Sequence, residues 1–113
     1  MYPIARKFDP DLVLVSCGFD AMAGDPEGHC SASQNIYGYM TQQLMGLAQG
    51  KVVAVLEGGY KLENLADGAE TVVKTLQKGF ADQSTSSPSE LGRKEVTAAA
   101  KAASEFWEIS SLA

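Results

Sequence analysis

The fold of this chain is decided by two similar stretches, Leu12-Val13-Leu14-Val15-Ser16-Cys17-Gly18 and Val52-Val53-Ala54-Val55-Leu56-Glu57-Gly58-Gly59. Each contains a short, continuous apolar run with β-branched residues, and glycine follows close behind it. Runs of this kind are typical of strands that are buried on both faces, as they are in parallel sheets. The sequence therefore predicts an α/β fold that is built on a parallel sheet.

The segment between the two strands predicts a helix. Ser33 can cap its amino end, and the helix is expected to run to about Gln49, with Gly50 as its stop. Its buried stripe is predicted from apolar residues at helical spacing, namely Ile36, Met40, Leu44 and Leu47. Strand, helix and strand in this order indicate a right-handed parallel crossover.

Two further helices are expected after the second strand. The first would pack on the same sheet through Leu62, Leu65, Ala66, Ala69, Val72, Val73 and Leu76. A polar stretch over 82–88 then reads as a linker. From Ser89 or Glu90 to Leu112 the pattern predicts a last helix, expected to fold back and dock its aromatic end, Phe106-Trp107, on the domain.

The chain supplies few elements for such a sheet. Strands buried on both faces need neighbouring strands and helices on either side, and only two strands are predicted here. Residues 3–8 read as the end of a helix that leads into the first strand. We therefore expect a fragment of a larger α/β domain.

Composition narrows the class of protein. The 113 residues carry a formal net charge of −5 and no basic patch, which argues against direct nucleic-acid binding. No apolar run is long enough for a membrane span, and the first residues lack the pattern of a signal peptide. The chain has two cysteines, Cys17 and Cys30, which favours a reducing compartment, the cytosol or the nucleus.

Polar residues gather where the two predicted strands end, which is where parallel sheets bind ligands. The first loop carries Asp20 and Asp25, and the second reads Glu57-Gly58-Gly59-Tyr60. Carboxylates near a strand end can hold a metal, and glycines let the backbone and a substrate approach closely. A tyrosine after a Gly-Gly turn can aim its hydroxyl into the same crevice.

Three segments carry a resemblance to a known family: residues 10–21 (PDLVLVSCGFDA), 24–26 (GDP) and 56–60 (LEGGY). They resemble the class II histone deacetylases, and most of all the branch that includes histone deacetylases six and ten. The resemblance extends from Pro3 to about Leu76, and more weakly to the last helix. It implies an arginase-like, three-layer α/β/α fold, with residues 1–81 as the carboxyl-terminal part of the catalytic domain, 82–88 as a linker and 89–113 as a terminal helix.

The resemblance also implies a single catalytic zinc ion and a role for each loop. Asp20 would be one of three protein ligands, while the other two and a pair of histidines would lie upstream of this chain. Tyr60 would donate a hydrogen bond to the acetyl carbonyl, which zinc would polarise as well. Gly58 and Gly59 would border the substrate channel.

The substrates implied are acetylated lysine side chains of histones or other proteins, or acetylated polyamines. The resemblance also implies that Glu27 lies at the channel rim, where a carboxylate would attract a cationic substrate. Co-repressor or regulatory proteins are the partners that the resemblance implies, in the nucleus or the cytoplasm. On its own the chain is expected to be inactive, because one carboxylate cannot hold a catalytic zinc ion.

Each role has a plainer alternative. Asp20 could form a turn or cap a helix, Tyr60 could cover the edge of the sheet, and Glu27 could be a solvated turn residue. Asp25 is interpreted as structural, and Glu57 either as structural or as a support for the residues of the site. The spacing of Cys17, His29 and Cys30 fits no standard zinc pattern. Two other functions compete: a non-catalytic interaction fragment, and a nucleotide-binding unit, which the absence of a glycine-rich phosphate motif disfavours.

Overall fold

The computed structural model describes residues 1–81 and 87–107 of the chain. The chain divides into two compact units. One is Asp9–Asp82, and the other joins Met1–Phe8 to Gln83–Ala113. The two loops predicted to carry the chemistry both belong to the first unit.

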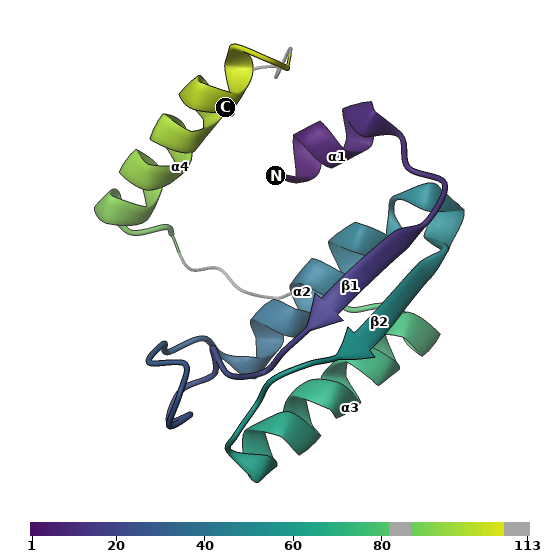
Figure 1. Cartoon of the computed structure of the whole chain (residues 1–113), viewed down its shortest axis with the longest axis vertical. Coiled ribbons are helices and arrows are strands. Elements are labelled where there is room, and N and C mark those ends of the chain that lie inside the picture. Colours follow the sequence, from purple (N-terminus) through teal and green to yellow (C-terminus); the bar gives the residue numbers. More distant parts are fainter. Residues whose placement is uncertain (82–86, 108–113) are drawn as a thin grey trace. The chain divides into compact units, whose positions relative to one another are not determined.

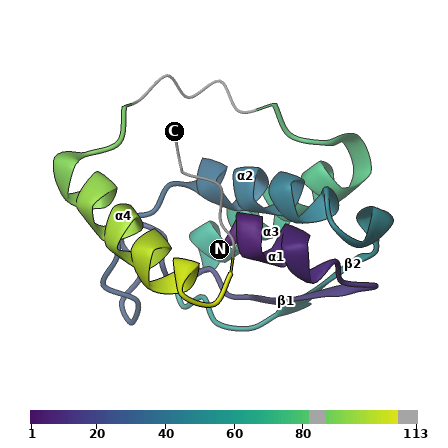
Figure 2. The same cartoon turned by 90° about the horizontal axis from the view of Figure 1, so that it is seen from above.

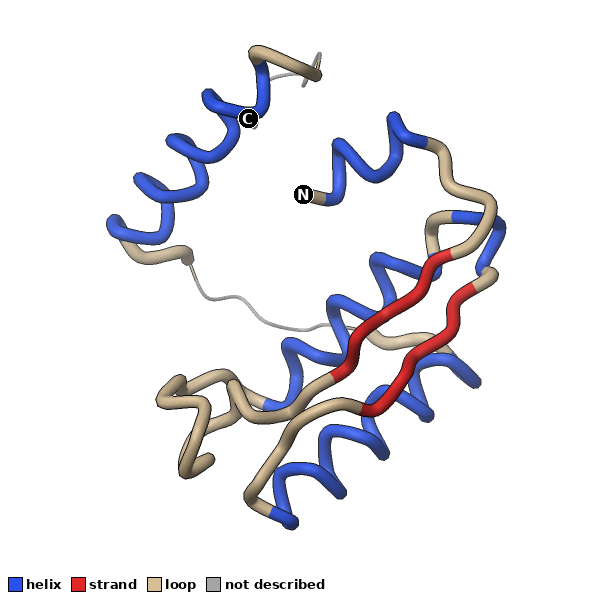
Figure 3. The backbone as a smooth tube through the Cα atoms, viewed as in Figure 1, coloured by secondary structure: helices blue, strands red, loops and turns tan. Residues whose placement is uncertain are grey.

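The centre of this unit is a parallel pair of strands, β1 (Val13–Cys17) and β2 (Val52–Leu56). Val13 pairs with Val52 at one end and Cys17 with Leu56 at the other, which confirms the predicted parallel arrangement (Figure 1). Because the strands are parallel and in step, their carboxyl ends meet at one edge. Figure 3 shows the loops that follow them leaving from that edge.

Two helices cover one face of the pair, α2 (Gln34–Met45) and α3 (Leu62–Lys78), as Figure 2 shows. α2 ends at Met45 rather than at about Gln49, so the predicted length is wrong. Gly46 is the C-cap, and the chain passes through an extended Leu47 into a short 3-10 turn over Ala48–Gly50. Glycine is a poor helix former, and here the Gly46 N–H donates to the Gln43 carbonyl while the Leu47 N–H donates to the Leu44 carbonyl.

The buried stripe of α2 also differs from the prediction. Tyr37 and Thr41 are buried, whereas Ile36 and Met40 are 39% and 45% exposed. Leu47 is buried as predicted, although it lies beyond the end of the helix. The stripe is displaced because α2 packs sideways against α3 as well as onto the sheet. The Gln34 amide donates to the Asp67 carbonyl and to the Thr71 hydroxyl of α3.

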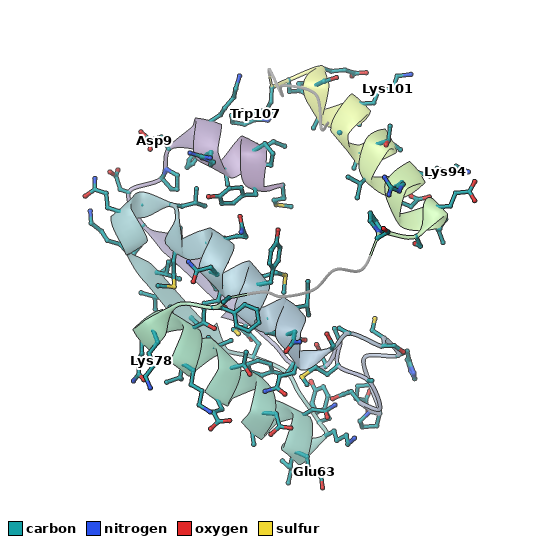
Figure 4. The ribbon with its side chains drawn as sticks, turned by 180° about the vertical axis from the view of Figure 1, so that it is seen from behind. Asp9, Glu63, Lys78, Lys94, Lys101 and Trp107 are labelled. Carbon is teal, nitrogen blue, oxygen red and sulfur yellow. The ribbon has the colours of Figure 1, made fainter. Side chains whose placement is uncertain are left out.

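The predicted buried stripe of α3 is confirmed for only part of its residues. Leu65, Ala69, Val72 and Leu76 pack against the core, while Ala66 is exposed and Leu62 and Val73 are 80% and 52% exposed. Glu63 stands in the first turn and Lys78 in the last, at opposite ends of the helix in Figure 4. Both charges oppose the helix dipole and so favour the helix.

The core lies between the sheet and these two helices. Its buried members are Cys17, Phe19, Met22, Tyr37 and Val72. The rings of Phe19 and Tyr37 meet at 5.0 Å between centroids with a 44° tilt, a favourable aromatic geometry. Phe19 directly precedes Asp20, so the core anchors the first loop immediately beside its candidate metal ligand.

The other face of the sheet is bare in the described part of this unit. Leu14, Val53 and Val55 are 69%, 47% and 53% exposed. The runs were predicted to be buried on both faces, and within residues 9–81 only the face toward α2 and α3 is covered. The fold is nevertheless the α/β class with a parallel sheet and flanking helices that the sequence predicts.

The second unit contains α1 (Tyr2–Phe8) and α4 (Glu90–Ser104). α1 confirms the helix expected over residues 3–8. Ser89 caps α4, where its hydroxyl accepts from the Gly92 N–H at 3.0 Å. α4 ends at Ser104, before the predicted end, because the chain turns over residues 105–107.

Parts of the sequence prediction lie outside the described residues. They are most of the linker, over 82–86, and the last part of the predicted helix, over 108–113. The docking of the terminal helix on the domain stays a prediction. No helix in the described part of the chain has the length and apolar character to cross a membrane.

Candidate functional site

Asp20 and Tyr60 lie on the two loops that leave the carboxyl ends of β1 and β2. The parallel pairing continues into these loops, because the Glu57 N–H donates to the Cys17 carbonyl at 3.1 Å and the Phe19 N–H to the Gly58 carbonyl at 2.8 Å. The loops are therefore held side by side for several residues beyond the strands.

The first loop, residues 18–33, is long but closes upon itself. The Ala32 N–H donates to the Ala21 carbonyl at 2.9 Å, and the Ala23 N–H donates to the Ala32 carbonyl at 3.1 Å. Asn64 of α3 adds a bond from its amide to the Ala23 carbonyl at 3.1 Å. These bonds fix the base of the loop beside the second one.

The side chains of Asp20 and Tyr60 converge at Gly58. A Cβ built on Gly58 would stand 2.7 Å from Asp20 Oδ2 and 3.5 Å from the Tyr60 hydroxyl oxygen. Both polar atoms thus approach a single point, as a shared reaction site requires. Asp20 is half-buried and Tyr60 is 58% exposed, so neither residue is enclosed in the core.

Gly58 and Gly59 leave this space open for different reasons. Any side chain on Gly58 would displace the Asp20 carboxylate. Gly59 has φ of 136°, which residues with a Cβ rarely adopt, and a Cβ there would press on Phe19 at 3.2 Å. The Gly-Gly turn therefore lets the second loop lie directly against Phe19 and Asp20.

Asp25 is the site residue whose importance the sequence reasoning missed. Its carboxylate is buried and accepts four backbone N–H bonds: from Glu27 and Gly28 on Oδ1, and from Tyr60 and Lys61 on Oδ2. Its position before Pro26 indicates only a turn, and nothing in the sequence indicates the partners 35 residues away. The structural interpretation was correct, but the carboxylate joins both loops.

The ionisation of Asp25 follows from these bonds. Burial alone would raise the pKa of its carboxyl group, but the N–H donors of Tyr60, Glu27, Gly28 and Lys61 favour the charged form and lower it below its ordinary value. Asp25 is therefore a carboxylate over the whole neutral range.

Tyr37 lies close to the carboxylates of Asp20 and Asp25. Burial raises the pKa of its phenol, and the negative charge of Asp20 raises it further. Tyr37 thus keeps its proton at neutral pH. The sequence reasoning did not single it out, because it lies on α2, far along the chain from either motif.

The described residues do not complete the predicted metal site. Among residues 1–81 and 87–107, no three His, Cys, Asp and Glu side chains are grouped so that they could hold a metal ion. Catalytic zinc sites use about three protein ligands, and Asp20 offers one carboxylate. Cys17 is buried, and burial raises the pKa of its thiol, while His29 and Cys30 are exposed.

Glu27 lies on the first loop and is exposed. Its backbone N–H donates to Asp25 Oδ1 at 2.9 Å, while the Tyr60 N–H donates to Oδ2 at 2.8 Å. One carboxylate thus connects Glu27 to the loop that carries Tyr60.

Comparison with known proteins shows which family the chain resembles. Residues 1–76 match the histone deacetylase domain. Histone deacetylase clr3 of Schizosaccharomyces pombe is 54% identical over 74 residues, which are 66% of this chain and 11% of clr3. Polyamine deacetylase HDAC10 of Homo sapiens is 53% identical over 76 residues, 67% of this chain and 11% of HDAC10.

A solved structure gives the same result. The structure of the histone deacetylase Clr3 superposes with a TM-score of 0.86 at 40% identity, over 94% of this chain and 18% of the Clr3 chain. The present chain thus corresponds to a small part of each relative. The family match and the likeness of fold agree, and the chain belongs to the histone deacetylase family.

Proposed function

We propose that this chain forms the carboxyl-terminal part of the catalytic domain of a zinc-dependent, class II deacetylase that hydrolyses the acetyl-lysine amide. The observation that carries the proposal is the convergence of Asp20 Oδ2 and the Tyr60 hydroxyl at Gly58. Two strand-end loops would not need to bring a carboxylate and a phenol to one point if each residue only formed a turn.

Each residue would have a definite task in the complete domain. The carboxylate of Asp20 would be one protein ligand of zinc, which supplies Lewis-acid polarisation of a carbonyl when bound. The Tyr60 hydroxyl would donate a hydrogen bond to the acetyl oxygen as negative charge develops on it. The Gly-Gly turn would leave room for the narrow acetyl-lysine chain beside both groups.

The remaining groups would come from sequence outside this chain. The described residues lack the further ligands and the histidine pair that the family resemblance implies. We therefore propose that the chain alone does not turn over substrate. Nucleus or cytoplasm is the proposed location, with co-repressor or regulatory proteins as partners.

The test is a chimera in which residues 1–76 replace the matching segment of Histone deacetylase clr3, called the clr3 chimera below. Tyr60→Phe should lower kcat on the order of 100-fold, the usual effect of removing one oxyanion donor. Asp20→Asn should lower the zinc content. Tyr39→Phe and Asp11→Asn, both at exposed positions, are the matched controls. Equal turnover by the Tyr60→Phe and Tyr39→Phe chimeras would refute the proposal.

A second substrate class is favoured by the position of Glu27. Its backbone is tied through Asp25 to the loop of Tyr60, and its side chain is exposed. A carboxylate at the mouth of the site would attract the cationic end of an acetylated polyamine. One of the relatives is named a polyamine deacetylase.

Glu27→Leu in the clr3 chimera tests this second class. The ratio of acetylpolyamine turnover to acetyl-lysine-peptide turnover should fall. Glu70→Leu, which removes the same charge from an exposed position of α3, should leave that ratio unchanged. An equal ratio in the two variants would show that Glu27 does not select the substrate.

A further inference from the structure

The carboxylate of Asp25 divides its two oxygens between two separate loops. Oδ1 accepts from Glu27 at 2.9 Å and Gly28 at 3.2 Å, two and three residues along the same loop. Oδ2 accepts from Tyr60 at 2.8 Å and Lys61 at 3.2 Å, at the start of α3. A turn residue needs only the first pair. The second pair requires an explanation of its own.

The second pair of hydrogen bonds holds the backbone at Tyr60, the residue that carries the phenol. The Tyr60 side chain is 58% exposed, so packing around its ring does little to fix it. Its backbone follows Gly58 and Gly59, which have no side chains to hold the turn. The N–H bond to Asp25 is therefore a direct restraint on where the Tyr60 side chain begins.

The same carboxylate lies in the loop that carries Asp20. That loop is held by its internal bonds and by the Asn64 amide, and Phe19 anchors it in the core. A bond from this loop to Tyr60 fixes the phenol relative to Asp20 rather than relative to α3 alone. The bonds are charge-assisted, and such bonds are shorter and stronger than neutral ones.

We infer that Asp25 is a positioning residue, whose carboxylate holds Tyr60 in register with Asp20. The inference rests on the proposed function of those two residues and adds a third to the site. Asp25 itself faces backbone N–H groups with both oxygens and does not act on the substrate. A misplacement of about 1 Å in a catalytic group can lower turnover on the order of 100-fold, so the restraint matters.

Asp25→Asn separates the two pairs of bonds. The amide has one acceptor oxygen, and its NH₂ group cannot accept from an N–H donor. Asparagine commonly accepts from the backbone a short distance ahead, as in the local pair. The variant should therefore keep the bonds to Glu27 and Gly28 and lose those to Tyr60 and Lys61.

The first experiment measures amide hydrogen exchange by NMR in the full 113-residue chain. In Asp25→Asn the Tyr60 and Lys61 amides should exchange at least tenfold faster. The Phe19 and Glu57 amides, which bond across the strand ends, should keep their rates. Asp67→Asn is the control, at an exposed position in α3. Equal acceleration at all four amides, or none at Tyr60, would overturn the inference.

The second experiment measures turnover in the clr3 chimera. Asp25→Asn should lower kcat at least tenfold with little change in KM, and should have no further effect in a Tyr60→Phe background. A general structural defect would instead lower kcat in both backgrounds, which would overturn the inference. If Tyr60→Phe alone has no effect, the proposed function fails, and the exchange data still decide whether Asp25 holds Tyr60.

Discussion

Asp25 connects the two loops at the level of single hydrogen bonds, so its protonation should be visible in the stability of the whole unit. Its folded-state pKa lies below the ordinary value of about 3.9. A carboxyl with a depressed folded pKa contributes stability at pH above its unfolded pKa, and the contribution is lost as pH falls through the folded pKa.

The predicted outcome is a pH-dependent difference between the wild type and Asp25→Asn. Urea unfolding should show the wild type as the more stable chain from neutral pH down to about pH 4. Below that the difference should shrink as Asp25 takes up a proton. Asp67→Asn, at an exposed site, should show no such convergence. If the difference in unfolding free energy between the wild type and Asp25→Asn stayed constant down to pH 2, the four N–H bonds would not lower the pKa of Asp25.

Gly58 gives a second prediction at this scale. Its Cβ would stand 2.7 Å from Asp20 Oδ2, so Gly58→Ala must displace the carboxylate, although the backbone conformation allows alanine. Disturbing the support of a metal ligand typically costs 10- to 100-fold in metal affinity. In the clr3 chimera, Gly58→Ala should weaken zinc retention by about that factor with little loss of folding. Gly46→Ala, at the open C-cap of α2, should retain zinc normally. Equal zinc affinity in the two variants would place Asp20 away from the metal.

At the scale of elements, the core depends on how α3 meets the loop after β1. Phe19 is 2% exposed, and it fills the space left by Gly68 of α3, where a Cβ would overlap its ring. We predict that Phe19→Ala destabilises the unit by about 3–5 kcal/mol, the usual range for a buried phenylalanine. Denaturant midpoints measure this. Phe106→Ala, at an 82% exposed position, should change stability by less than about 0.5 kcal/mol. A similar small change for Phe19→Ala would mean that the aromatic pair is not the core.

Much of the fold could be predicted from local pattern. The two apolar runs indicated β1 and β2 and their parallel pairing. Continuous runs of β-branched residues that end at glycine are typical of strands in parallel sheets. The meeting of the loop ends then followed from strand direction. The buried stripe of α2 could not be predicted this way. Ile36 and Met40 have helical spacing, but Tyr37, which packs on Phe19, and Thr41 are buried instead.

The site was predictable only in part for a similar reason. Asp20 and Tyr60 stand at strand ends, where position in the chain implies position in space. The role of Asp25 depends on bonds to residues 35 and 36 positions away, which no local pattern encodes. The role of Gly58 became evident only when its surroundings were known, since the sequence shows a Gly-Gly pair without its neighbours.

At the scale of the whole molecule, the chain spans 11% of the relatives clr3 and HDAC10. This bears on activity, because among the described residues Asp20 has no companions that could complete a metal site. We predict that the purified 113-residue chain shows no chelator-sensitive deacetylation and binds zinc no better than its Asp20→Asn variant. Isothermal titration and an acetyl-lysine peptide assay measure both. The clr3 chimera is the positive control, and robust, chelator-sensitive turnover by the chain alone would contradict the prediction.

The bare face of the sheet bears on stability at the same scale. Leu14 of β1 is 69% exposed, yet it belongs to an apolar run typical of a strand that is covered on both faces. The exposure of Leu14 should therefore differ between the 113-residue chain and a longer protein. In the 113-residue chain, Leu14→Ser should change the free energy of unfolding by less than about 0.5 kcal/mol, as expected for an exposed position. In the clr3 chimera, where further sequence is present, it should cost about 2–5 kcal/mol, as expected for a buried leucine.

Val15→Ser is the matched control for this comparison. Val15 points to the opposite face, where it packs against the core formed with α2 and α3. That face is covered within the 113-residue chain, so the substitution should destabilise the chain and the chimera alike. Denaturant unfolding of the four variants gives the result directly. If Leu14→Ser is equally mild in both contexts, the second face of the sheet is open to solvent even in the longer protein. The apolar run would then need another explanation than burial within the deacetylase domain.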